Sequence, residues 1–137
     1  MIIPMIRGLM LTLGRLFSKP ITVQYPEERT APAPRWRGAQ YFEQDERGKT
    51  KCVACGLCMI VCPSQCISIE TVEDDEGRRV PLTYELDASR CIFCGYCEEA
   101  CPVGAIFMGR TYDWVESKRK PLVLDTDKLM KNRGTKE

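Results

Sequence analysis

Eight of the nine cysteines fall into two runs with the same spacing, each followed by a proline. The first run is Cys52, Cys55, Cys58 and Cys62, and the second, which lies 39 residues later, is Cys91, Cys94, Cys97 and Cys101. Thiolates in such runs bind iron–sulfur clusters, and the fourth cysteine of each run ligates the cluster held mainly by the other run. The sequence therefore predicts two [4Fe–4S] clusters.

Crossed ligation assigns every cysteine of the two runs to one cluster. We expect the first cluster to be bound by Cys52, Cys55, Cys58 and Cys101, and the second by Cys91, Cys94, Cys97 and Cys62. The fourth cysteine follows the third by about one helical turn, a rise of roughly 6 Å, so its thiolate points away from its own cluster. Gly56 and Gly95 lack a Cβ, which lets each loop turn tightly next to sulfide.

Other uses of these cysteines fit the spacing poorly. A zinc site takes four ligands, usually as two separated pairs. A disulfide framework is typical of small secreted chains. No secretion signal is expected, because no basic segment precedes the first apolar stretch and no A-x-A-like site closes it. The absence of histidine excludes Rieske ligation, c-type haem attachment and Cys/His zinc fingers.

The elements that must position these cysteines are short. Pro63 and Pro102 are expected to end a short helix in each run. Residues 67–72 and 80–86 alternate well enough to predict two strands, joined by a solvated acidic tip. Aligning residues 52–69 with 91–108 gives identity at both glycines and at Ile67 and Ile106, besides the ligands and prolines. This duplication predicts an α+β, ferredoxin-like core with pseudo-two-fold symmetry.

Apolar side chains near the runs are expected to line the clusters. The candidates are Ile60, Val61, Ile67, Ile69, Ile92, Phe93, Ile106 and Phe107. The ninth cysteine, Cys66, aligns with Ala105, a small packing position, and we expect a buried apolar thiol there.

The first twenty residues predict an amphipathic helix that ends at Lys19-Pro20. Eight apolar side chains fall within one arc of about 160° at the helical period, and Arg7 and Arg15 lie on the opposite face. These two arginines leave no apolar run near the roughly 20 residues that span a bilayer. The pattern is typical of a helix lying in the membrane interface. The alternative is a helix packed on a partner protein or on its own core.

Charge is distributed unevenly along the chain, although the net charge is only +1. Residues 1–51 carry nine basic and five acidic side chains, residues 52–108 three and nine, and residues 109–137 eight and five. We therefore expect three parts: a helix with an extended interaction arm (1–51), a two-cluster domain (52–108) and a C-terminal interaction tail (109–137). Such arms suit acidic partner proteins or anionic lipid headgroups.

Details of the two arms follow from local composition. Prolines between residues 20 and 38 predict an extended segment, and residues 40–51 are polar and are expected to lead into the first run. Residues 111–114 are expected to fold back onto the core. Asp125 or Thr126 is expected to cap a short helix that runs through Met130.

The chemistry of the chain is then electron transfer. The sequence contains no paired carboxylates, no nucleophile–base set and no nucleotide-binding loop, so we expect no catalytic residue of its own. Nucleic-acid binding is not expected, since the basic residues lack a matching motif. No diffusible small-molecule substrate is expected to bind directly. The partners would be redox centres in other proteins.

Several stretches resemble subunit I of bacterial NADH:quinone oxidoreductase, respiratory complex I. The resemblance rests on Gly8-Leu9, residues 19–27, Arg35-x-Arg37-Gly38, residues 52–58 and residues 90–106, and it extends to about Leu129. It implies the same eight cysteine ligands, and a relay toward the quinone-reducing cluster of a neighbouring subunit. It also implies contacts with other cluster subunits and, beneath the first helix, with a membrane subunit. The site departs from the family at Cys66, where alanine is usual, and at Trp36 inside the arginine–glycine motif.

The resemblance also implies a peripheral location on the cytoplasmic side of the inner membrane. Two other interpretations stay open at this point. One is the matching subunit of a related membrane-bound hydrogenase or ferredoxin-linked complex, with a different electron donor. The other is a freely diffusing ferredoxin-like carrier, which would need neither the first helix nor the long arms.

Overall fold

The computed structural model describes residues 2–132 and divides the chain by its contacts into two units, Met1–Ala31 and Pro32–Glu137. Helix α1, Ile2–Leu16, belongs to the first unit, and none of its residues is buried. No helix within residues 2–132 combines the length and the apolar character needed to span a bilayer. The division falls well before residue 51, because residues 39–42 are buried within the second unit.

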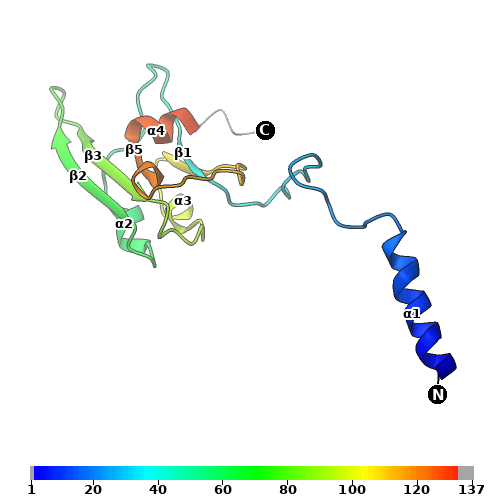
Figure 1. The fold of residues 1–137 in the computed structure, drawn as a ribbon. Coiled ribbons are helices and arrows are strands. Elements are labelled where there is room, and N and C mark those ends of the chain that lie inside the picture. The colour runs from blue at the N-terminus through cyan, green and yellow to red at the C-terminus, as the bar shows by residue number, and fades with distance from the viewer. Residues whose placement is uncertain (1, 133–137) are drawn as a thin grey trace. The chain divides into compact units, whose positions relative to one another are not determined.

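The second unit contains two small antiparallel sheets (Figure 1). The three-stranded sheet has the order β2-β3-β5, with β2 at Ile67–Glu73, β3 at Arg79–Asp87 and β5 at Val123–Asp125. The two-stranded sheet pairs β1, Gln40–Phe42, with β4, Ile106–Met108. Each sheet therefore joins segments that are distant in the sequence, which fixes the N-terminal and C-terminal parts of the unit to its centre.

The predicted hairpin over residues 67–86 is confirmed. Strands β2 and β3 pair from Ile67 opposite Leu86 to Glu73 opposite Arg79, with one shift of register between Glu70 and Thr71. At the tip, Asp74 accepts hydrogen bonds from the backbone N–H of Arg78 (2.8 Å) and from its guanidinium (3.0 Å). The acidic tip is thus a self-contained turn exposed to solvent.

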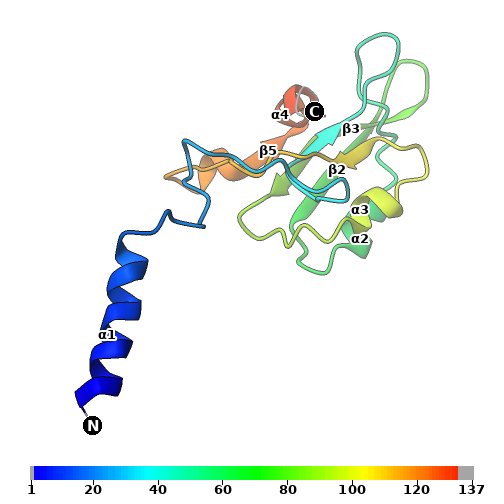
Figure 2. The ribbon, with the colours of Figure 1, turned by 90° about the vertical axis from the view of Figure 1, so that its right-hand side faces the viewer.

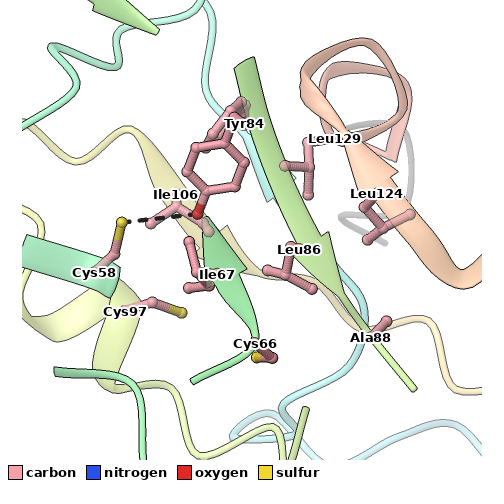
Figure 3. Packing of buried hydrophobic residues seen from close by; sticks show 11 residues of the cluster. Cys58, Cys66, Ile67, Tyr84, Leu86, Ala88, Cys97, Ile106, Leu124 and Leu129 are labelled. Carbon is pink, nitrogen blue, oxygen red and sulfur yellow. Dashed lines mark hydrogen bonds between the residues drawn. The ribbon is translucent and has the colours of Figure 1, made fainter. Parts of the chain in front are cut away.

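The core lies against strand β3, whose inward side chains are Tyr84 and Leu86 (Figure 3). The Tyr84 ring meets the Phe42 ring of β1 edge to face, with centroids 4.8 Å apart at 69°. Aromatic pairs favour this arrangement because the positive ring edge faces the negative ring face. The polar segment expected over residues 40–51 therefore begins with a buried strand, which the sequence prediction missed.

The C-terminal segment is built into the same core. After the short 3₁₀ turn η1, Lys120–Leu122, strand β5 pairs with β3, and helix α4, Thr126–Lys131, follows. The backbone N–H of Lys128 donates to Asp125 Oδ1 at 2.8 Å, which confirms the cap and selects Asp125. Leu124 and Leu129 are both buried in the core cluster. The segment expected as an interaction tail thus supplies core residues in its second half.

A close backbone contact joins the start of the second unit to the segment after β4. The backbone N–H of Gly38 donates to the carbonyl oxygen of Gly109 at 2.8 Å. A Cβ at residue 38 would lie 2.2 Å from the carbonyl oxygen of Thr111, so only glycine fits. Trp114 packs against the core cluster, which confirms that this segment folds back.

Candidate functional site

Two short helices position the cysteine runs. Helix α2, Leu57–Val61, and helix α3, Tyr96–Glu99, lie side by side in the second unit (Figures 1 and 2). Each begins after a glycine in the left-handed region, Gly56 with φ 78° and Gly95 with φ 83°. The glycines therefore make the tight turns predicted for them. Each helix buries the third cysteine of its run.

Left-handed backbone conformations recur at the same interval as the cysteines. Ala54 and Phe93 have φ values of 48° and 53°, although neither is a glycine. In this conformation their backbone N–H groups donate to cysteine sulfur, from Ala54 to Cys52 at 3.4 Å and from Phe93 to Cys91 at 3.3 Å. Such positions are strained for residues with a Cβ and cluster at functional sites. No local signal marks these positions in the sequence, since neither residue type favours this region.

The first cavity is lined by four cysteines, three from the first run and one from the second. They are Cys52, Cys55, Cys58 and Cys101. The other walls are mainly apolar and are provided by Phe42, Val53, Ile69, Val103, Ala105 and Ile106, together with Tyr84. This small, largely apolar hollow thus brings one cysteine of the second run to three of the first.

The second cavity has the reciprocal set of cysteines and a similar size. Its cysteines are Cys62, Cys91, Cys94 and Cys97, with Cys66 as a fifth. Its remaining walls include Gln40, Ile67, Leu86 and Ile92. Two hollows of similar size, each with three cysteines of one run and the last of the other, fit two copies of the same group.

The thiols of the first cavity interact electrostatically across the two runs. Burial raises the pKa of Cys52, and the nearby charges of Cys58, Cys101 and Cys55 raise it further. Burial also raises the pKa of Cys58, with contributions from Cys55 and Cys101. Metal ions bind the deprotonated thiolate and offset this mutual repulsion. The donor set therefore fits a cationic iron core.

In the second cavity, burial and the charge of Cys91 raise the pKa of Cys97 to about 12. Cys62 behaves differently, because hydrogen bonds outweigh its burial and hold its pKa below the ordinary value. These bonds come from the backbone and thiol of Cys66 and from the backbone of Ser64 and Gln65. Burial and the bond to Cys62 raise the pKa of Cys66. A Cys62 thiolate bound to a cluster can only accept a hydrogen bond, so Cys66 would then be the donor of the pair.

Among residues 2–132, three side chains outside the two cysteine runs reach the sulfur of a predicted ligand. Tyr84 Oη lies 3.8 Å from Cys58 Sγ (Figure 3), and Gln40 Nε2 donates to Cys91 Sγ at 3.1 Å. The thiol of Cys66 lies 3.5 Å from Cys62 Sγ. Sequence reasoning identified Cys66 only as a buried thiol and missed Gln40 and Tyr84. No local signal marks them, because the strands that carry them reach the cysteines only in the folded chain.

The predicted apolar lining is correct in part. Ile67, Ile69, Ile92 and Ile106 line the cavities. Ile60 instead faces outward with 77% of its surface exposed, and Val61 is also exposed. Phe107 stacks on Tyr41, with ring centroids 5.7 Å apart. The predictions for Ile60 and Val61 were wrong, because α2 turns only its Cys58 face inward. Phe93 and Phe107 line neither cavity either, so those two predictions were also wrong.

Arg37 holds the loop of the second run from outside. Its guanidinium donates to the carbonyl oxygen of Cys94 and lies 3.3 Å from Glu99 Oε1. A Cβ at residue 95 would lie 2.8 Å from Arg37 Nε, so the Arg37 side chain covers the Gly95 turn closely.

Within residues 2–132, no three His, Cys, Asp or Glu side chains are placed to hold a single metal ion.

Comparison with known proteins identifies the family. The sequence matches the 4Fe-4S dicluster domain family over residues 51–105. It is 45% identical over 130 residues to NADH-quinone oxidoreductase subunit I 2 of Geobacter metallireducens, covering 95% of this chain and 98% of the relative. The chain belongs to the subunit I family of NADH-quinone oxidoreductase. Another member, subunit I 1 of Geobacter sulfurreducens, is 44% identical over 133 residues, covering 97% of this chain and all of the relative.

A solved structure agrees with this subunit I assignment at the level of the fold. A chain of the membrane-bound sulfane sulfur reductase, an archaeal respiratory membrane complex, superposes with a TM-score of 0.55 at 32% identity. The alignment covers 80% of this chain and 55% of that one. The subunit I 2 relative of Rhizobium meliloti is likewise longer, since a match of 128 residues at 44% identity covers 93% of this chain and 68% of the relative.

Proposed function

We propose that this chain is an electron-relay subunit of a membrane-associated NADH-quinone oxidoreductase. The observation that carries the proposal is the pair of cavities, each combining three cysteines of one run with the last cysteine of the other. The matching family contains two clusters of the 4Fe-4S type, and the closely similar relatives are subunits of that oxidoreductase. Each cluster, when bound, accepts and passes on one electron at a time.

The ligand sets follow the lining of the cavities. In this proposal the first cavity holds a cluster on Cys52, Cys55, Cys58 and Cys101, and the second on Cys91, Cys94, Cys97 and Cys62. The backbone N–H groups of Ala54, Phe93 and Ala105 then stabilise negative charge on ligand sulfur. Each helix carries a ligand of one cavity and is followed in the chain by a ligand of the other, so the packing of α2 on α3 fixes the separation of the two clusters.

The pseudo-two-fold symmetry of the core belongs to the same proposal. Three pairs of residues with positive φ, Ala54/Phe93, Gly56/Gly95 and Gln65/Gly104, are each separated by 39 residues. This interval equals that of the cysteine runs. The backbone of one half thus repeats the turns of the other. We propose that residues 52–108 hold both clusters, that β1 and the segment after β4 complete their core, and that the part of the chain before Pro32 is the interaction arm.

The chain acts by holding and shielding rather than by acid–base chemistry. Apolar walls exclude water from the thiolates, and the buried Tyr84 hydroxyl, 3.8 Å from Cys58 Sγ, would donate to that sulfur in its thiolate form. The partners in this proposal are other subunits of the complex: cluster-bearing subunits beside the two cavities, and a membrane subunit near α1. Electrons would pass toward the quinone-reducing cluster of a neighbouring subunit at the cytoplasmic face of the inner membrane.

A related role has one observation in its favour. The structural neighbour is part of a sulfane sulfur reductase, a different respiratory membrane complex. A chain with the same relay could therefore serve an assembly with another donor. The electron donor that reduces the intact assembly distinguishes the two functions.

The functional test uses the membrane assembly that contains this chain. Replacing Cys58 by alanine should reduce NADH-dependent quinone reduction to background, because one ligand of the relay is lost. NADH oxidation by a soluble artificial acceptor should continue, since it bypasses the relay. Val115→Ala, at a side chain that is 85% exposed, is the control and should leave both rates unchanged. Full quinone reduction by the Cys58→Ala assembly would contradict the proposal.

Helix α1 is proposed to lie on the membrane surface. Its apolar residues Ile6, Leu9 and Leu13 are exposed in this chain, and Arg7 and Arg15 lie on the other face of the helix. Burial of such a stripe in the headgroup region is favourable, and basic residues add attraction to anionic lipid.

We expect the full chain to bind vesicles containing anionic lipid, and Leu9→Glu to weaken binding by about tenfold or more, since a charge enters the apolar stripe. Thr12→Glu is the matched control, because it makes the same change in charge on the polar face. Sedimentation with vesicles measures both. Equal loss in the two variants would indicate charge attraction alone, and no binding by the unmodified chain would favour a protein partner for α1.

A further inference from the structure

The second cavity contains a buried side-chain amide whose nitrogen has a hydrogen-bond partner and whose oxygen has none among the described residues. Gln40 in β1 is only 1% exposed, and its Nε2 donates to Cys91 Sγ at 3.1 Å. Its Oε1 has no hydrogen-bond partner among the described residues. Burying an amide with an unpaired oxygen is unfavourable, so an apolar side chain would serve packing better. The contact with ligand sulfur is therefore the property that this glutamine adds.

The same cavity contains a thiol that the first cavity lacks. Cys66 is buried, and its Sγ lies 3.5 Å from Cys62 Sγ. The residue 39 positions later, Ala105, lines the first cavity with a methyl group. The backbone donors to sulfur are matched between the halves, as Ala54 and Phe93 show. The two cavities thus differ in the side chains that contact cysteine sulfur, and not in the backbone donors.

Donors to ligand sulfur change the redox behaviour of a cluster. Reduction adds one electron, and the added negative charge spreads onto the sulfur atoms, where a donor stabilises it. The first cavity receives one such side-chain contact, from Tyr84 at 3.8 Å. The second receives two shorter ones, from Gln40 and Cys66. Neither residue forms or breaks a covalent bond in this step.

We propose that Gln40 and Cys66 are tuning residues that raise the reduction potential of the cluster held in the second cavity. This inference rests on the ligand sets proposed above. It assigns to β1 a role beyond packing, because the strand that closes the core also carries a donor to a ligand. It also gives the ninth cysteine a function without making it a ligand.

The test is a potentiometric titration of the anaerobically prepared full chain, followed by low-temperature EPR. Gln40→Met and Cys66→Ala each remove one donor with little change in volume or packing. We expect each to shift the reduction equilibrium of the second cluster about tenfold toward the oxidised form, which is about 59 mV for one electron. The first cluster should not shift. Tyr84→Phe is the mirror control and should lower only the potential of the first cluster.

The outcomes separate this inference from the proposed function. Absence of cluster signals from the unmodified chain would overturn the proposed function. Two clusters with unchanged potentials in both Gln40→Met and Cys66→Ala would overturn the tuning role alone, as would equal shifts of both clusters. If the Gln40→Met variant does not fold, the reduction potentials of the Cys66→Ala variant decide whether the tuning role holds. Ala105→Cys provides the reverse test, since a thiol placed beside Cys101 should raise the potential of the first cluster.

Discussion

The Cys101→Ala variant is expected to lose the cluster of the first cavity and to keep the cluster of the second. Position in the sequence alone would suggest loss of the other cluster, because Cys101 lies in the second run. In the folded chain, however, it lines the first cavity with Cys52, Cys55 and Cys58. Its charge contributes to the raised pKa of both Cys52 and Cys58. The neighbouring Ala105 offers no replacement ligand.

Iron and acid-labile sulfide should fall to about half in this variant, because each of two equal clusters holds half of both. EPR of the reduced full chain identifies which cluster remains. The reciprocal variant is Cys62→Ala, combined with Cys66→Ala so that no second thiol stays within reach of the site. Cys66→Ala alone is the control and should keep both clusters.

Uncrossed ligation would give the opposite pattern. Cys101→Ala would then lose the cluster bound by Cys91, Cys94 and Cys97, and the double variant would lose the one bound by the first three cysteines. Loss of both clusters in either variant would mean that neither half holds its cluster alone, and iron content would separate this outcome from the crossed one.

The parts of the site that could be predicted are those set by short-range geometry. Spacing of two residues between cysteines, a glycine at the turn and a proline after the helix all act within a dozen residues. The turns at Gly56 and Gly95 and the hairpin after Cys66 were therefore predictable. The cap at Asp125 is equally local, since its carboxylate accepts from a residue three positions later.

The parts that were missed depend on contacts between distant segments. Strand β1 is only three residues long and includes Gln40, so neither its length nor its polarity suggests a buried strand. It forms because β4 offers a partner more than sixty residues later. Tyr84 has the appearance of an ordinary strand residue in the sequence, and its approach to Cys58 arises only in the folded chain, where β2 contacts α2 and β3 pairs with β2.

The C-terminal segment was also mispredicted because its contacts are with distant segments, and here the missed burial contributes more to the stability of the fold. Its basic composition predicts a solvated arm, and basic residues such as Lys120 and Lys131 do lie at the surface. Between them, however, Leu124 and Leu129 are spaced so that β5 and α4 each turn one leucine toward the core. Two buried residues in a mainly polar stretch are too few to produce a clear periodicity.

Leu129→Ala is accordingly expected to destabilise the fold by about 2–5 kcal/mol, the range for deleting a buried leucine side chain. Leu129 is fully buried, and α4, which carries it, packs against β1, β5 and β3. Because it lines neither cavity, its loss tests the core without removing a contact to a cluster. Urea denaturation of the full chain, followed by far-UV circular dichroism, measures the change in the free energy of unfolding.

Leu82→Ala is the matched control for this prediction. It makes the same substitution on strand β3, but its side chain is 63% exposed, so the change should stay within about 0.5 kcal/mol. Equal, small effects of the two variants would mean that α4 is a detachable arm, as its composition suggests. A large effect at Leu129 alone would make residues 123–131 part of the unit that folds around the two cavities. Removing α4 would then also loosen β1, the strand that positions Gln40.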